Sequence, residues 1–535
     1  MVVRFDPPAG SDEPGSGTPE FVPAISPELL ERHGGRVLEP DRVVVEGWPT
    51  AGGRYRSTVY RPGVLLIPGE IWAAKHQDVI NPLLGGIGMR GEAATDARTP
   101  APVRILLRPR DAKTAATIDS WHALQHLRAA AIVPGPDAGE AELAKELLRA
   151  EVERFSLEHL IATTDDTTVL KPWAISDNPG GSSTRSSYRG RFPVVLAAAP
   201  PDRGIVDRRP VIAVVDSGCL QHPLLEIFDP EIDQQAGTRP ITVAPDIQRA
   251  ITAGHGPNPP LPTRVIEGYW DGPDTYEPLV GDLADAYGHG TFIAGIIRQA
   301  APCAQVLAIK AVHSDKIGYS ADALTALDKI LDRVIHAQDH NDPEMMVDVV
   351  SFSAGYYDEW DGTPELIRVV DGLISRGVVV VAAAGNEATD RPFYPAALAA
   401  RPAGQTGGRQ VIGVGALNPD GSKALFSNED RWVTAWGSGV NVVSMYPPET
   451  DGSETPERAL PARKRHALDP DKFAGEYAVW SGTSFATPLV AAKVANLLLE
   501  VSAGGPGDQP NRLAMTNVDQ ATTVDRARAA LPQMP

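Results

Sequence analysis

The stretch that decides the fold is VIAVVD, residues Val211–Asp216. It is a continuous apolar run, rich in β-branched side chains, and it ends in a carboxylate. A run without polar alternation is typical of a parallel strand that is buried on both faces of a sheet. Further runs of this kind follow in the second half of the chain, at Val306–Val312, Val347–Phe352, Gly377–Ala383 and Val411–Val414.

Helical patterns separate these runs, at Ala321–Gln338 and Pro364–Arg376. The alternation of apolar strands with helices predicts an α/β domain with a doubly wound, mostly parallel sheet. In such a sheet the functional site lies beyond the carboxyl ends of the strands. We therefore expect polar residues that directly follow the apolar runs to carry the chemistry.

The earlier part of the chain predicts a second, smaller domain. Apolar runs at Val64–Pro68 and Val103–Leu107 predict strands, and helical spacing is found at Ile71–Leu84, Ala115–Ala131 and Glu140–Leu160. Shifts in composition set the boundaries. We predict a disordered N-terminal tail (1–23), a small mixed α/β domain (24–175), a Gly/Ser-rich linker (176–208), the main α/β domain (209–505) and a C-terminal tail (506–535) with a short helix at Val518–Ala530.

Composition narrows the functional classes. The chain has 535 residues, of which 42% are hydrophobic, so it can build sizeable cores, and its net charge of -19 disfavours a nucleic-acid binder. The N-terminus lacks an apolar signal core and no apolar stretch is long enough to span a bilayer. We expect no membrane association and a cytoplasmic location, with non-standard export left open. Cys219 and Cys303 are predicted to be free thiols, and a bridge between them stays open.

Polar residues occupy the expected positions for chemistry. Asp216 ends the first run, His289 lies between glycines, Asn386 follows the run VVVVAAAG, and Ser484 precedes the apolar stretch Phe485–Leu499. Taken singly, each has an ordinary explanation as a turn residue or a helix N-cap. Together they are the groups that acyl transfer needs, because a serine nucleophile requires a histidine base and a carboxylate that orients it. An Asn side chain and an N–H at a helix start can stabilise the oxyanion.

The motifs VIAVVDSG, HGTFIAG, AAAGNE and SGTSFATP resemble, in the same order, those of the subtilisin-like serine protease family (subtilases, peptidase family S8). The resemblance covers about Pro210–Glu500. It implies that Asp216 orients the histidine, that His289 is the general base and acid, and that Ser484 is the nucleophile. It also implies that the Asn386 side chain and the Ser484 N–H form the oxyanion hole.

The resemblance further implies that the substrate is held as an added β-strand between two segments of the enzyme. A pocket beside them would receive the side chain that precedes the cut. The implied substrate-binding residues are Ser353, Ala354 and Gly355 on one edge, Ile317, Gly318 and Tyr319 on the other, and Ala383, Ala384 and Gly385 in the pocket wall. Glu387 would lie at the pocket mouth, where it could accept a basic side chain. Phe393 would lie at the pocket base, where it could shorten the pocket.

The sequence departs from the family pattern in three places. Phe292 stands where many members have a second histidine. The helix after His289 runs directly into Ala301, where many secreted members carry a calcium-binding loop, so we expect no metal site and no cofactor. Two insertions, 228–284 and 446–477, are predicted to be solvated loops, and a role beside the cleft or in partner binding stays open.

The sequence thus predicts a serine endopeptidase that cuts protein or peptide substrates through an acyl-enzyme. Its N-terminal domain is predicted to be either a prodomain that inhibits the cleft of the same chain, with cleavage in the linker near Pro179, or a recognition module. A catalytically silent, protease-derived binding scaffold is the alternative function. A sedolisin-like enzyme is disfavoured, because that class has acidic residues where this chain has His289 and Asn386.

Overall fold

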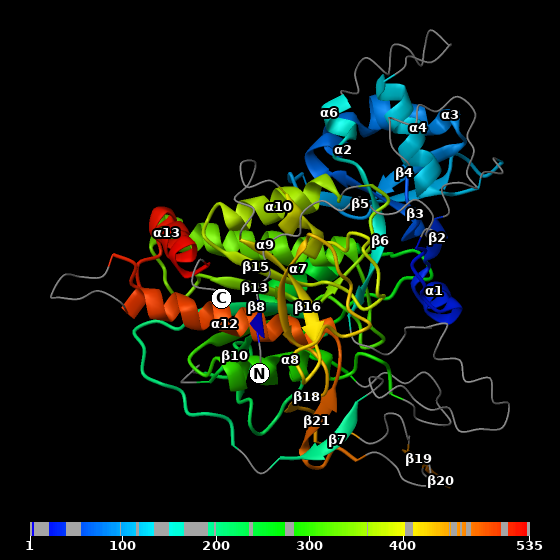
Figure 1. The fold of residues 1–535 in the computed structure, drawn as a ribbon. Coiled ribbons are helices and arrows are strands. Elements are labelled where there is room, and N and C mark those ends of the chain that lie inside the picture. The colour runs from blue at the N-terminus through cyan, green and yellow to red at the C-terminus, as the bar shows by residue number, and fades with distance from the viewer. Residues whose placement is uncertain are drawn as a thin grey trace.

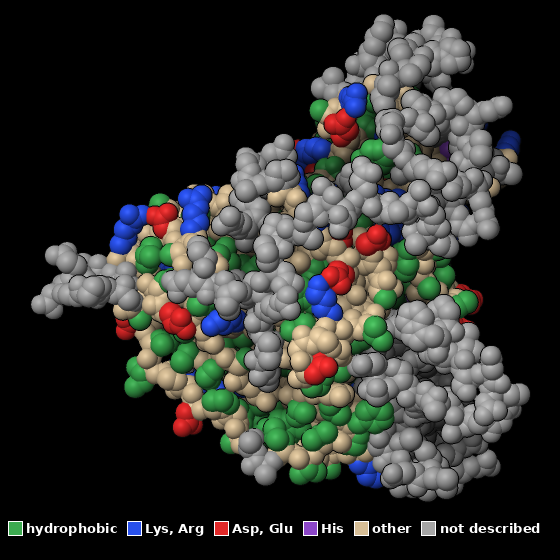
Figure 2. All heavy atoms as spheres, in the orientation of Figure 1, with side chains coloured by type: hydrophobic (Ala, Val, Ile, Leu, Met, Phe, Trp, Pro, Cys, Tyr) green, Lys and Arg blue, Asp and Glu red, His purple; other side chains and the backbone are tan. Residues whose placement is uncertain are grey.

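The computed structural model shows a large body that carries a smaller N-terminal lobe (Figures 1 and 2). On the face seen in Figure 2, acidic and basic side chains are interspersed and do not form a single patch. The structure describes residues 3–4, 21–38, 55–96, 98–113, 117–132, 149–164, 191–196, 199–234, 239–272, 283–360, 362–401, 410–448, 450, 457–460, 463–466, 472–503 and 512–531.

The main sheet has nine strands, in the order β1-β17-β16-β15-β13-β8-β11-β10-β9. At its centre β8 (Val211–Asp216) pairs in parallel with β11 (Gln305–Lys310) and β13 (Val349–Phe352). The pairings from β17 to β9 are all parallel, and only β1 is antiparallel to its neighbour. The predicted parallel sheet is therefore confirmed. Its other strands are β1 (Val3–Arg4), β9 (Ile227–Phe228), β10 (Ile241–Val243), β15 (Val379–Ala383), β16 (Val411–Leu417) and β17 (Val433–Ser438).

Helices cover both faces of this sheet (Figure 1). Successive side chains of β8 alternate between two cores, with Ala213 and Val215 in one and Ile212 and Val214 in the other. This alternation follows from the period of two along a strand. The first core includes α7 (Pro245–Ala253), α9 (Ser320–His340) and α10 (Pro364–Ile374), and the second includes α8 (His289–Ala300) and α12 (Thr483–Ala503). The helices predicted at 321–338 and 364–376 are confirmed.

The helix α12 is long and apolar enough to cross a membrane by length and composition alone. However, 72% of its most apolar window is buried inside the protein. Its apolar character is therefore that of a core helix, packed between β15, β16 and α8. No other helix in the described ranges passes the same test.

The N-terminal lobe is built on a second, antiparallel sheet. Its strands β3 (Thr58–Pro68) and β5 (Pro102–Pro109) confirm the two predicted apolar strands. One face packs on helices that bury a separate core around Leu65, Ile105 and Leu124. The lobe also contains α1 (Pro27–His33), β2 (Arg36–Leu38), α2 (Gly69–Lys75), the π-helix η2 (His76–Ile80), α3 (Asn81–Gly86), β4 (Met89–Ala93), α4 (Ser120–Ile132), α6 (Arg149–Val152) and β6 (Ser156–Thr163).

The helix predicted at 140–160 is wrong from Ser156 onward, where the chain forms the strand β6, whereas α6 lies within the predicted range. The spacing of Leu157, Leu160 and Ile161 imitates a helix. The strand prevails because it gains partners on both edges, and because its polar side chains Glu158 and His159 are paired inside the protein with Arg104 and Glu359. These partners are distant in sequence, so a local pattern cannot reveal them.

The first predicted insertion is more ordered than a solvated loop. It contributes β9 and β10 to the edge of the main sheet and α7, whose Ile247 and Ile251 are buried. Part of the second insertion lies outside the described residues, and its basic run forms β20 (Arg463–His466) opposite β19 (Glu457–Leu460). Residues 165–190, which include the linker segment around Pro179, also lie outside them. The end of the linker forms β7 (Phe192–Val195), which pairs with β21 (Glu476–Trp480) beside β18 (Val442–Met445).

Domain boundaries stay predictions, although two features bear on the tails. Val3 and Arg4 pair with β17, so part of the stretch predicted to be a disordered tail forms a strand. The predicted C-terminal helix is present as α13 (Gln520–Ala530).

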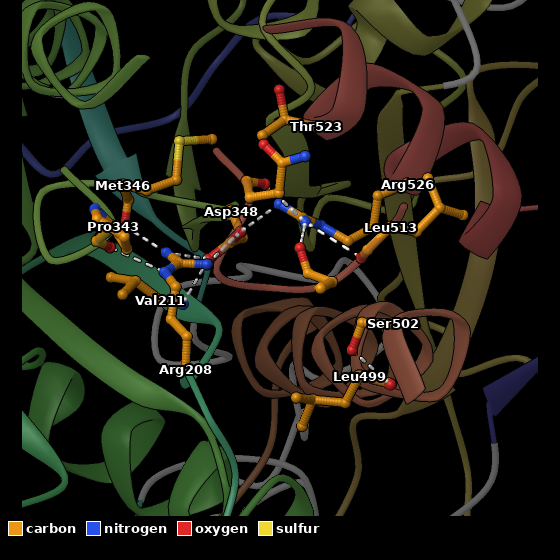
Figure 3. Close-up of polar contacts among 12 residues, drawn as sticks. Arg208, Val211, Pro343, Met346, Asp348, Leu499, Ser502, Leu513, Thr523 and Arg526 are labelled. Carbon is orange, nitrogen blue, oxygen red and sulfur yellow. Dashed lines mark hydrogen bonds and ion pairs between the residues drawn. The ribbon is translucent and has the colours of Figure 1, made fainter. Parts of the chain in front are cut away.

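A buried carboxylate connects the start of β8 to α13 (Figure 3). Asp348 accepts hydrogen bonds from Arg208 at 3.0 and 2.9 Å and from the Val211 N–H at 2.8 Å. Arg526 of α13 lies 3.9 Å from the same carboxylate and donates to backbone carbonyls, including that of Ala514 at 2.6 Å. Asp348 therefore holds the entry to the central strand and the C-terminal helix against the sheet.

We expect Asp348→Asn to lower the free energy of unfolding by about 3 kcal/mol, because removing one partner of a buried ion pair leaves the other charge uncompensated. Denaturant unfolding followed by tryptophan fluorescence measures the change. The matched control is Asp332→Asn, which removes the exposed partner of Lys329 and should cost less than about 0.5 kcal/mol. Equal effects of the two substitutions would contradict the account.

Candidate active site

Asp216 and His289 meet at the carboxyl end of the central strand. Asp216 is the last residue of β8 and His289 is the first residue of α8. The His289 Nδ1 lies 2.7 Å from Asp216 Oδ1, which also accepts a hydrogen bond from the Ser217 N–H at 2.7 Å. Both side chains are buried. A buried carboxylate in this position fixes the tautomer and orientation of the imidazole.

Aromatic rings pack around the His289 imidazole. The His289 ring lies 5.2 Å from the Phe485 ring and 5.5 Å from the Trp480 ring, measured between centroids. Phe292, which replaces a frequent histidine, packs 4.7 Å from Phe485. The substitution at Phe292 therefore extends the apolar packing and adds no polar group to the site.

A second carboxylate, Asp271, connects the loops around this pair. Its Oδ2 accepts from the Gly288 N–H at 2.8 Å and from the Ser217 hydroxyl at 3.2 Å, and its Oδ1 accepts from the Ser314 hydroxyl at 2.6 Å. Burial raises the pKa of Asp271, and Lys310 opposes that rise. Asp271 thus positions the segments that follow β8 and β11 and precede α8. The sequence interpretation missed it, because it lies in an insertion that was predicted to be solvated.

Ser484 lies in the first turn of α12, next to Phe485. Its hydroxyl donates to the Ser353 carbonyl oxygen at 3.0 Å and accepts from the Thr164 N–H at 3.0 Å. The Thr164 hydroxyl lies 2.8 Å from it. Because Phe485 packs on His289, the structure brings Ser484 to the same edge of the sheet as the Asp216–His289 pair.

Two hydrogen-bond donors converge on the carbonyl oxygen of Thr164. The Asn386 Nδ2 donates to this oxygen, and so does the Ser484 N–H, at 3.2 Å. The Asn386 amide is held in this orientation because its Oδ1 accepts from the Thr483 N–H at 3.0 Å and from the Thr483 hydroxyl at 2.9 Å. Two fixed donors on one carbonyl oxygen are the arrangement that stabilises an oxyanion.

The strand β6 fills the space between the two predicted substrate-binding segments. Ile317, Gly318 and Tyr319 form β12, which pairs antiparallel with Ala162, Ile161 and Leu160. On the other edge, Ala354 and Gly355 form β14 and pair with Thr163 and Ala162. The Thr164 N–H donates to the Ser353 carbonyl at 3.2 Å and extends this ladder. The end of the N-terminal lobe therefore occupies the predicted substrate position. Figure 1 shows β6 running from the lobe along the main body.

The predicted pocket wall is buried beside Thr164. Ala383 ends β15, Ala384 and Gly385 follow it, and all three are buried. Gly385 has a φ of 99°, and a Cβ there would lie 2.3 Å from Asn428 Nδ2, so glycine is required.

Glu387 and Phe393 line the same pocket as Thr164. The Glu387 Oε2 accepts from the Tyr357 hydroxyl at 2.6 Å and from the Asn386 N–H at 2.8 Å, and burial raises the pKa of Glu387. Its Oε2 atom is therefore already engaged in hydrogen bonds within the protein. Phe393 is buried, and the centroid of its ring lies 5.0 Å from that of the Tyr357 ring.

One cluster of potential metal ligands is present among the described residues, formed by His159, Asp358 and Glu359. Its ligand atoms lie within 4.8 Å of one another, and His159 Nε2 lies 2.7 Å from Glu359 Oε2. At that distance the two side chains form a hydrogen-bonded ion pair between the lobe and the main body. Cys219 and Cys303 are free thiols, as predicted.

Comparisons with known proteins agree with these observations. A family model described as "Subtilase family" matches residues 207–532. A thermophilic serine proteinase of Bacillus sp. (strain AK1) is 29% identical over 250 residues, which cover 45% of this chain and 48% of that protein. An intracellular serine protease of Paenibacillus polymyxa is 28% identical over 253 residues, which cover 44% of this chain and 61% of that protein.

Among solved structures, a cold adapted subtilisin-like serine proteinase is 19% identical, with a TM-score of 0.33 and coverage of 60% of this chain and 86% of that one. The matched region spans less than two thirds of the length of either curated relative.

We expect Asp271→Ala to destabilise the protein by about 2–5 kcal/mol, since several buried donors lose their acceptor at once. Hydrogen exchange should also accelerate at the Gly288 amide, which bonds directly to Asp271. Asp420→Ala is the control, because Asp420 caps only the exposed Ser422 turn. Unchanged exchange at Gly288 would show that Asp271 does not organise these loops.

Proposed function

The chain belongs to the subtilase family, and from this premise we propose that it is a serine endopeptidase that hydrolyses peptide bonds through an acyl-enzyme. In this proposal Asp216 orients His289, His289 takes the proton of the Ser484 hydroxyl, and Ser484 attacks the substrate carbonyl. The Asn386 amide and the Ser484 N–H stabilise the resulting oxyanion. His289 then gives the proton to the leaving amine as the peptide C–N bond breaks, which leaves an ester on Ser484. Water, deprotonated by His289, attacks this ester, and the Ser484 hydroxyl is restored as the acid product leaves.

The convergence of two N–H donors on the Thr164 carbonyl oxygen carries the proposal. The same carbonyl belongs to a residue whose N–H bonds to the Ser484 hydroxyl and whose strand is paired on both edges. A peptide bound in this way has its scissile carbonyl next to the nucleophile. We propose that Thr164 is the residue that precedes the cut.

The N-terminal lobe, by this proposal, is an intramolecular inhibitor that the enzyme itself cleaves. The proposed scissile bond joins Thr164 to Asp165, upstream of the site near Pro179 that the sequence favoured. After cleavage β6 still fills the cleft until the lobe leaves. A recognition module would not need its terminal strand between β12 and β14, so these pairings favour an inhibitor.

Buried charges across the interface favour a single register of the docked lobe. Arg104 of β5 donates to Asp322 at the start of α9 at 2.6 Å and to Glu158 of β6 at 2.6 Å. Arg61 bonds to the same Glu158 at 2.7 Å, and His255 lies 3.1 Å from Asp322. All these groups are buried. Only one register of β6 pairs every charge, which favours the observed position of Thr164.

A fluorophosphonate tests the proposed nucleophile. We expect the wild-type chain, once it has split and shed the lobe, to be labelled at Ser484 and to cleave a peptide substrate. The Ser484→Ala variant should neither be labelled nor cleave the peptide substrate. Ser502→Ala, at the far end of the same helix, should be labelled at the wild-type rate. Absence of labelling and of peptide cleavage in the split wild-type chain would instead support the silent scaffold.

Docking of the cleaved lobe should weaken as pH rises. Burial works to lower the pKa of His159, but the Glu359 carboxylate outweighs it, so the docked pKa is raised. Burial and Glu359 also raise the pKa of Asp358 to about 6. For His159 the stabilisation is complete below its undocked pKa of about 6.5 and is lost as the pH rises through its docked pKa. Asp358 has largely lost its proton above about pH 7, so His159 dominates the dependence from there upward. One proton limits the effect to about tenfold in affinity per pH unit.

The measurement is the release of the lobe, followed by size-exclusion chromatography of the split wild-type chain from pH 6 to 9. His159→Gln should flatten the dependence, whereas His340→Gln, on the exposed end of α9, should leave it intact. Tighter docking at pH 9 than at pH 6 would contradict the assignment.

A further inference from the structure

We infer that this enzyme cuts after small side chains, such as threonine, serine, alanine or valine, and disfavours leucine, phenylalanine and lysine in that position. The inference rests on the proposed function, because it takes Thr164 as the residue that precedes the cut. It goes beyond that proposal by naming the substrate class. Thr164 lines one cavity together with Gly355, Tyr357, Glu387 and Phe393.

The base of the pocket is filled by aromatic rings that belong to the main body. Phe393 is buried, and a methyl group built on Gly355 would lie only 2.4 Å from its Cε1 atom. The Phe393 ring therefore lies directly against the backbone of β14. Tyr357 packs 5.0 Å from Phe393, measured between ring centroids, and is also buried. A long side chain at the position of Thr164 would have to displace one of these rings.

Hydrogen bonds prevent Tyr357 from moving aside freely. Its hydroxyl donates to Glu387 Oε2 at 2.6 Å and accepts from Asn428 Nδ2 at 2.8 Å. Asn428 also bonds to the Ala384 carbonyl at 2.8 Å, so the ring is connected to the opposite pocket wall. Displacing Tyr357 would break hydrogen bonds between buried groups, which is costly unless each finds a new partner.

The same network argues against a basic residue before the cut. The Glu387 Oε2 already receives hydrogen bonds from Tyr357 and from the Asn386 N–H. A lysine that recruited this oxygen would compete with the bond that orients the backbone next to the oxyanion hole. The pocket is therefore too short for a lysine side chain, and the Glu387 Oε2 atom is already engaged in hydrogen bonds.

The remaining space is too small for a large side chain. The cavity along this edge has a volume of about 60 Å³, and it is shared between the pocket side at Glu387 and Phe393 and the far side of β6 at Ile25 and Lys316. Such a volume holds about four to six water molecules, since one needs roughly 10–15 Å³ on this measure. Only part of it lies beside Thr164. Phe21, which also lines it, leaves with the lobe, but Tyr357 and Phe393 stay.

A peptide series tests the inference on the split wild-type enzyme. The parent peptide LIATTDDTT reproduces residues 160–168, and the position of Thr164 is varied to Ala, Val, Leu, Phe and Lys. We expect kcat/KM to be highest for Thr, Ala and Val and about 10- to 100-fold lower for Leu, Phe and Lys, the scale typical of overpacking a formed pocket. Mass spectrometry of the products confirms which bond is cut.

Pocket variants provide the converse test. Phe393→Gly should raise the ratio of kcat/KM for the Phe peptide to that for the Thr peptide by about tenfold or more. Leu425→Ala, an exposed apolar residue outside the pocket, should leave the ratio unchanged. If Phe393→Gly does not fold, the wild-type series decides alone.

The outcomes separate the two levels of the proposal. Equal or faster cleavage after Phe, Leu or Lys by the wild-type enzyme would overturn the inferred preference while leaving the protease assignment intact. An unchanged ratio in folded Phe393→Gly would likewise overturn the role given to this ring. Failure to cut any peptide, including the parent, would overturn the proposed function and the inferred preference together.

Discussion

The carbonyl oxygen of Thr164 is the point on which the other features of the site depend. It receives hydrogen bonds from the Asn386 side chain and from the first turn of α12. Both donors are fixed before the strand arrives, because Thr483 holds the amide and the helix holds the N–H. Preorganised donors of this kind favour the charge that develops during acyl transfer. The parallel sheet supplies the geometry, since β8, β15 and the starts of α8 and α12 meet at one edge.

The same carbonyl fixes the relationship between the lobe and the main body. For Thr164 to reach the two donors, β6 must pair with β12 and β14 in one register. That register also pairs Arg104 with Asp322 across the interface. A buried ion pair adds little net stability but makes mispaired arrangements expensive. The charges therefore select the register, while the strand pairing and the apolar side chains supply the affinity.

Residue patterns revealed the features that repeat locally. The parallel strands were predictable because Val211–Asp216 and the similar runs are apolar on both faces. The places of Asp216, His289, Asn386 and Ser484 after a strand or at a helix start were predictable because each lies in a recognisable motif, and their catalytic roles stay predictions. β6 was missed because its polar residues are paired with distant partners, and Asp271 because nothing near it in sequence marks it as buried.

Mapping the new N-terminus of the catalytic fragment tests this account most directly. Purified wild-type chain is allowed to split, and the fragment that contains Ser484 is sequenced from its N-terminus or weighed by mass spectrometry. The account predicts that this fragment begins at Asp165. A fragment that begins elsewhere, for example near Pro179, or a chain that stays whole although the folded protein reacts at Ser484, would contradict it.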